Sequence, residues 1–86
     1  MPGESTEEKV KEILLEILDI KEEDVVPTAT FVDDLGATSI DVVEIMTAFE
    51  NTFDLEIGPE HASKVKTVQD AIDLLKMAID QKGVGT

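Results

Sequence analysis

Apolar residues recur every three or four positions in three segments of the chain, at about residues 5–19, 39–53 and 68–81. This spacing places apolar side chains on one face of a helix. A hydroxyl residue precedes each segment or opens it, with an acid three positions later, as is typical of a helix start. The three pairs are Ser5 and Glu8, Thr38 and Asp41, and Thr67 and Asp70. The pattern therefore predicts three main helices, and no alternating strand pattern competes with it.

A long connection, about residues 20–37, separates the first two predicted helices and contains Pro27. Connections of this length are uncommon in compact domains unless they have a function or are held by buried side chains. We expect Phe31, Val32 and Leu35 to hold this one, and Gly36 to supply a flexible backbone position before the second helix. Further on, Pro59 opens the segment PEHASKV and suits the first position of a fourth, short helix.

These elements predict an all-α fold, a small helical bundle of three main helices plus one short helix, with a long loop between helices one and two. The 86 residues suffice for a single domain, which we expect to span residues 1–86 with frayed ends at about 1–4 and 82–86. The expected core stripe of the second helix is Val42, Ile45, Met46, Phe49 and Phe53, and that of the last helix is Val68, Ala71, Ile72, Leu75 and Ile79.

The second helix also carries an apolar patch outside its core stripe. Ile40 points away from the core, Val43 and Thr47 flank it, and Glu44 lies beside them. An outward apolar patch ringed by carboxylates favours a partner-binding surface. The alternative is that isolated exposed apolar residues are common and have no function.

The charge of the chain is −13, and it is distributed unevenly. Between Glu22 and Ser63 there are eleven carboxylates and no cation. Such a surface repels nucleic acid and anionic lipid, and it attracts basic patches on protein partners. A purely solubilising role is the alternative. The first residues lack the basic and apolar blocks of a signal peptide, and no run is long enough to span a membrane, so we expect a cytoplasmic protein without stable membrane insertion.

Candidate chemistry is sparse. The chain has no cysteine, which excludes disulfides, thiol catalysis and cysteine-ligated metal. Ser39 would need a neighbouring base to act as a nucleophile, and the one histidine, His61, lies in the weakly structured third segment. The acids around Asp33 and Asp34 lack the spacing of a calcium loop. We therefore expect no enzyme activity, no catalytic residue and no metal site.

Two stretches, FVDDLGATSIDVVEIMTAFENTFDLEI and TVQDAIDLL, make the chain resemble the acyl carrier proteins, in particular those of type II fatty-acid synthesis. The resemblance runs from about Glu7 to Ile79, and its most specific part is Phe31-x-x-Asp-Leu-Gly36 followed by Ser39. It implies that Ser39 carries a covalent 4′-phosphopantetheine arm, transferred from coenzyme A by a phosphopantetheinyl transferase. Acyl groups would then ride as thioesters on the arm's thiol, which explains how a carrier can lack cysteine.

The resemblance also implies partners: the transferase, and acyl-transferring and acyl-modifying enzymes of fatty-acid or specialised lipid or polyketide biosynthesis, each with a basic docking patch. We expect the carrier to be a monomer and to bind no nucleic acid. An acyl chain could enter in part between Ile45, Met46, Phe49 and Leu75. The partner-binding residues expected on this basis are Asp34, Thr38, Ile40, Asp41, Val43, Glu44, Thr47 and Glu50.

One departure concerns the attachment segment. The family usually reads Asp-Ser-Leu where this chain reads Thr38-Ser39-Ile40. Thr38 can still cap the helix, but it lacks the carboxylate, so we interpret the change as altered partner choice with modification retained. Two alternatives stay open, a carrier of aminoacyl or D-alanyl groups and an unmodified acidic helical module that binds one basic partner.

Overall fold

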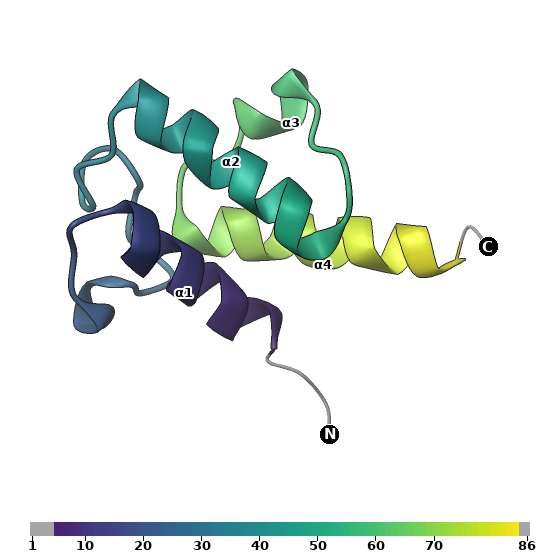
Figure 1. The fold of residues 1–86 in the computed structure, drawn as a ribbon, viewed down its shortest axis with the longest axis horizontal. Helices are drawn as coiled ribbons and strands as arrows, with labels where there is room; N and C mark the ends of the chain where they lie inside the picture. The colour runs from purple at the N-terminus through teal and green to yellow at the C-terminus, as the bar shows by residue number, and fades with distance from the viewer. Residues whose placement is uncertain (1–4, 85–86) are drawn as a thin grey trace.

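The computed structural model describes residues 5–84 and shows a bundle of three longer helices with one short helix at its edge (Figure 1). The longer helices are α1 (Thr6–Ile17), α2 (Ser39–Phe53) and α4 (Val68–Val84). The short helix α3 (Pro59–Ala62) lies beside both α2 and α4 (Figure 1). The expected all-α architecture is confirmed.

All three predicted helix starts carry their capping hydrogen bonds. The Ser5 and Thr38 hydroxyls accept the backbone amides of Glu8 and Asp41 at 3.2 and 3.1 Å, and each acid side chain accepts the cap amide in return. Thr67 and Asp70 make the same reciprocal pair at the start of α4, both bonds at 3.1 Å. Because these bonds satisfy amides that a helix start leaves without partners, local sequence alone fixes where each long helix begins.

The core lies between α1, α2 and α4 and is aliphatic apart from two phenylalanines, Phe31 and Phe49. No polar or charged side chain of the described residues is buried in it. Of the expected stripe on α2, Ile45, Met46 and Phe49 are buried, whereas Val42 and Phe53 are half-buried and pack against the core.

The connection between α1 and α2 is ordered by burial and by backbone hydrogen bonds. It contains a short 3₁₀ turn, η1 (Glu22–Asp24), that the sequence did not predict. Ala29, Phe31, Leu35 and Ala37 are buried. The segment is also bonded to the residues just before α4 and in its first turn: the Phe31 amide donates to the Lys66 carbonyl at 3.0 Å, and the Val68 amide to the Ala29 carbonyl at 2.9 Å.

Two residues expected in the core are exposed. Val32 is 60% exposed because residues 30–35 form a helical turn, in which the Leu35 amide donates to the Thr30 carbonyl. That turn points Phe31 and Leu35 inward and Val32 away from them. Ile79 is 37% exposed, since Lys76 already pairs with Glu7 in the first turn of α1, and later residues of α4 extend past α1.

The end of α4 also differs from the expectation, because the helix continues to Val84, three residues further than its predicted end. The fraying expected at residues 1–4, 85 and 86 lies outside the described residues.

Candidate functional site

Ser39 is the first residue of α2, and its side chain is exposed. The capping role belongs to its neighbour Thr38, whose hydroxyl accepts the Asp41 amide. Within residues 5–84, the Ser39 hydroxyl makes no hydrogen bond. The site therefore presents a free primary alcohol at a fixed position, on a helix start that does not need it for stability.

A tight turn before α2 fixes the direction in which the helix leaves the loop. The Ala37 amide donates to the Phe31 carbonyl at 2.8 Å, and the Gly36 amide to the Val32 carbonyl at 3.1 Å. Gly36 has φ of 71°, in the left-handed region that side chains disfavour, and open space lies where a Cβ would project. The glycine is required for its backbone conformation, not for lack of space.

The charges around Ser39 act in two directions. The first amides of a helix have no partner within the helix, and those of Ser39 and Ile40 therefore favour an anion beside them. The Asp41 carboxylate lies in the same turn and opposes this, although it already accepts the Thr38 amide at 3.0 Å. In this site the helix start can accept a phosphate group, and acidic neighbours moderate the attraction.

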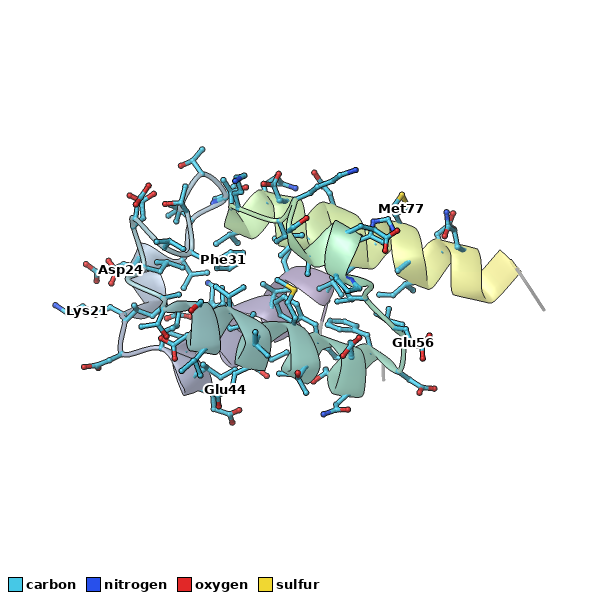
Figure 2. The ribbon with its side chains drawn as sticks, turned by 90° about the horizontal axis from the view of Figure 1, so that it is seen from above. Lys21, Asp24, Phe31, Glu44, Glu56 and Met77 are labelled. Atoms are coloured by element: carbon cyan, nitrogen blue, oxygen red, sulfur yellow. The ribbon has the colours of Figure 1, made fainter. Side chains whose placement is uncertain are left out.

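The outward face of α2 is as the sequence predicted. Ile40 and Val43 are 73% and 65% exposed, and Glu44 and Thr47 are exposed beside them. Figure 2 shows the Glu44 side chain pointing away from the bundle. We call Ile40, Val43, Glu44 and Thr47 the α2 face; it is an apolar patch with an acidic rim, next to Ser39.

Three of the expected partner-binding acids have structural bonds; the sequence predicted the bond of Asp41 but not those of Asp34 and Glu50. Asp41 caps α2, as described above. The Asp34 carboxylate accepts the Thr30 amide at 2.8 Å and the Thr30 hydroxyl at 3.2 Å. Glu50 is half-buried, and its carboxylate accepts the Ile57 amide at 2.8 Å. The Glu50 bond spans seven residues, so no helical or turn spacing indicates it.

A cavity of about 360 Å³ opens between the first connection, α2 and α3. Its walls are apolar at Phe31, Val42 and Val65, with Asp33 and Lys66 among the polar groups that also line it. Val42 is three residues after Ser39 on α2, hence one turn away on the same side. The residues expected to line an acyl site, Ile45, Met46, Phe49 and Leu75, are buried in the core and do not line this cavity. The sequence missed it because its walls come from three separate segments.

Among the residues that the structure describes, the carboxyl groups with lowered pKa values are those of Asp70 and Glu7, and both lie away from Ser39. Hydrogen bonds from the Lys66 and Thr67 amides lower the pKa of Asp70, and a hydrogen bond from the Lys76 ammonium lowers that of Glu7. His61 is exposed. In residues 5–84, no three His, Asp or Glu side chains are grouped to hold a metal ion, and no helix has the length and apolarity needed to cross a membrane.

Comparison with known proteins agrees with this geometry. A family model described as a phosphopantetheine attachment site matches residues 8–75, which is more than half of the chain. Among solved structures, a protein from Mycobacterium tuberculosis provisionally assigned as an acyl carrier protein is similar, with 27% identity and a TM-score of 0.80. The match covers 85% of this chain and 97% of that one. The chain therefore belongs to the acyl carrier protein family, whose members are non-catalytic carriers with a phosphopantetheine attachment site.

Proposed function

We propose that this protein carries acyl groups as thioesters on a 4′-phosphopantetheine arm attached to the Ser39 hydroxyl. The cofactor follows from the family match. The attachment residue is inferred from one observation above all: Ser39 presents an exposed hydroxyl, free of hydrogen bonds within the described residues, at the start of α2.

The residues around Ser39 fit the group that they would hold. A phosphodiester on the hydroxyl would lie beside the free amides of the first helical turn. Thr38 would keep its capping bond, because its own hydroxyl is separate from the modified one. The arm supplies the thiol that this cysteine-free chain lacks, while Ser39 supplies a fixed tether.

The proposed partners are enzymes with basic docking patches: the phosphopantetheinyl transferase that loads the arm, and enzymes that transfer or modify the acyl group. The α2 face supports this proposal, since its apolar centre can bury area and its acidic rim attracts Lys and Arg. We propose Asp34, Thr38, Asp41 and Glu50 as additional contacts at the edge of this face. We propose that the protein is a cytoplasmic monomer. It would serve fatty-acid synthesis or the synthesis of specialised lipids or polyketides.

Loading of the arm tests the attachment residue. Apo protein is incubated with coenzyme A and a broad-specificity transferase, and intact mass is measured for wild type, Ser39→Ala and Ser63→Ala. We expect wild type and the Ser63 variant to gain one phosphopantetheine mass, and the Ser39 variant to gain none while keeping its helical circular dichroism. Loading of Ser39→Ala would overturn Ser39 as the attachment residue, and no loading of wild type would overturn the carrier proposal and favour an unmodified binding module.

A further inference from the structure

The first amides of α4 find their partners in the connection between α1 and α2. The Val68 amide donates to the Ala29 carbonyl at 2.9 Å, and the Gln69 amide donates to the Pro27 carbonyl at 3.0 Å. A helix start leaves such amides without partners inside the helix. The start of α4 is therefore bonded to the middle of that connection, although α2 and α3 separate the two in the sequence.

The Asp70 carboxylate holds the residues just before α4. It accepts the Lys66 and Thr67 amides, both at 3.1 Å. Hydrogen bonds to an ionised carboxylate are stronger than those between neutral groups. The Thr67 N–H and the Lys66 carbonyl belong to one peptide group, and a peptide group is planar. The bond that fixes the Thr67 N–H therefore also fixes the direction of the Lys66 carbonyl.

Phe31 connects this carbonyl to the helix start that carries Ser39. The Phe31 amide donates to the Lys66 carbonyl at 3.0 Å, and the Phe31 carbonyl accepts the Ala37 amide at 2.8 Å. Both Phe31 and Ala37 are buried. Ala37 directly precedes Thr38, the cap of α2. A change in the direction of the Lys66 carbonyl can thus reach the start of α2 through a single residue.

We propose that Asp70 is a positioning residue for the loading of Ser39, which acts through the Lys66 carbonyl and Phe31. With its carboxylate bonded, the start of α2 is held in one position. Without the carboxylate, the peptide group between Lys66 and Thr67 can rotate, the bond from the Phe31 amide weakens, and the Ser39 hydroxyl takes up a range of positions. The effect on loading rests on the proposed function, whereas the bonds are properties of the unmodified chain.

Loading is sensitive to position because of its geometry. The Ser39 oxygen forms a bond to a phosphorus of coenzyme A, the bond from that phosphorus to the adenosine bisphosphate group breaks, and the hydroxyl proton passes to a base of the transferase. The attacking and leaving oxygens must lie roughly in line, and a small misplacement lowers the rate steeply. No residue of the bonded path belongs to the α2 face, so docking should not change.

Scalar couplings across hydrogen bonds, measured by NMR on the apo protein, test the bonded path. Wild type should show couplings from Phe31 to Lys66 and from Ala37 to Phe31. In Asp70→Ala both should shrink, the first more than the second. These couplings report on the folded state alone, so a loss of overall stability does not affect them. An unchanged coupling from Ala37 to Phe31 would overturn the proposal, because the effect would then end before α2.

Three further variants make the test specific to the carboxylate. Asp70→Glu should restore both couplings, since glutamate is the usual acid at this position of a capping box. Asp70→Asn, which keeps the shape and loses the charge, should show smaller changes than Asp70→Ala. Asp73→Ala is the matched control: it removes an exposed carboxylate one turn further along α4 that accepts the Gln69 side chain at 2.8 Å. Equal changes in Asp73→Ala and Asp70→Ala would contradict the proposed path.

Loading kinetics with coenzyme A and a broad-specificity transferase test the consequence. We expect Asp70→Ala to lower kcat about threefold or more, with the KM for the carrier unchanged. Asp70→Glu and Asp73→Ala should load like wild type. A wild-type kcat in Asp70→Ala, or a change confined to KM, would overturn the positioning role. Failure of wild type to load would refute the carrier proposal instead, and the couplings would still decide whether Asp70 positions the start of α2.

Discussion

The two connections that flank α2 are held in different ways. The first, residues 18–38, is long, yet it buries Phe31 and Leu35 and is bonded along its backbone to the segment before α4. The second, residues 54–58, is short, has no buried residue, and is fastened to α2 by Glu50. Length is thus a poor guide to burial in this molecule.

The difference matters because both connections border the same site. The first sets the direction of α2 and the position of Ser39, which a carrier must present reproducibly to its partners. The second sets the position of α3, which forms a wall of the adjacent cavity. Burial thus holds the segment that precedes the attachment site, whereas the second connection is held by its half-buried residues Leu55 and Ile57 and by the two bonds to Glu50.

The largest loss of stability is expected from a substitution at Phe31, a residue of the first connection that is 2% exposed. Phe31→Ala removes a buried aromatic ring and should lower the free energy of unfolding by about 3–5 kcal/mol. Urea denaturation followed by circular dichroism measures it. The neighbouring Val32→Ala is the control, since Val32 is exposed, and should change stability by about 0.5 kcal/mol or less. Equal losses in the two variants would contradict the role assigned to burial in the first connection.

The contrast between Phe31 and Val32 also shows what the sequence could predict. Capping pairs are local, so Ser5, Thr38 and Thr67 marked the helix starts correctly. Apolar character alone could not separate Val32 from Phe31, because their orientations depend on the turn of residues 30–35. The sequence predicted the loop before Ser39, with Gly36 as its flexible position. The exposure of Ser39 is compatible with the role that the resemblance implies.

The features that the sequence did not predict depend on tertiary contacts. The Glu50 bond to Ile57 joins residues at no regular spacing, and the cavity takes its walls from Phe31, Val42 and Val65, which lie far apart in the chain. Asp34 and Glu50 were both expected to be partner contacts on the basis of the family resemblance, which the acidic segment around them fits. Composition cannot distinguish a carboxylate that faces solvent from one that accepts a backbone amide.

A smaller loss of stability is expected at Asp34, an exposed residue whose carboxylate bonds stabilise the turn of the first connection. Asp34→Ala removes the acceptor of the Thr30 amide and hydroxyl and should cost about 1–2 kcal/mol of unfolding free energy. The adjacent Asp33→Ala removes the same charge without a hydrogen bond and should stay within about 0.5 kcal/mol of wild type. Urea denaturation of both variants makes the comparison. A loss in Asp33→Ala as large as that in Asp34→Ala would assign the effect to charge and contradict the bond's role.

The smallest change in stability should appear at acidic pH. It concerns Asp70, which lies in the first turn of α4, next to the residues to which the first connection is hydrogen-bonded. The Asp70 carboxylate accepts the Lys66 and Thr67 amides, each at 3.1 Å, and these bonds lower its pKa below the ordinary value of 3.8. A carboxyl whose pKa is lower in the folded state stabilises the fold above its unfolded pKa, and this contribution disappears as pH falls through the folded pKa. The stability of wild type relative to Asp70→Asn should therefore be constant near neutral pH and decrease below about pH 4. Thermal unfolding of both proteins over this pH range measures the difference in stability between them. Protonation of the other carboxylates affects both proteins equally and therefore cancels. A difference that stays constant down to the lowest pH would show that the Asp70 charge does not stabilise this segment, and that the first connection depends on burial and neutral hydrogen bonds alone.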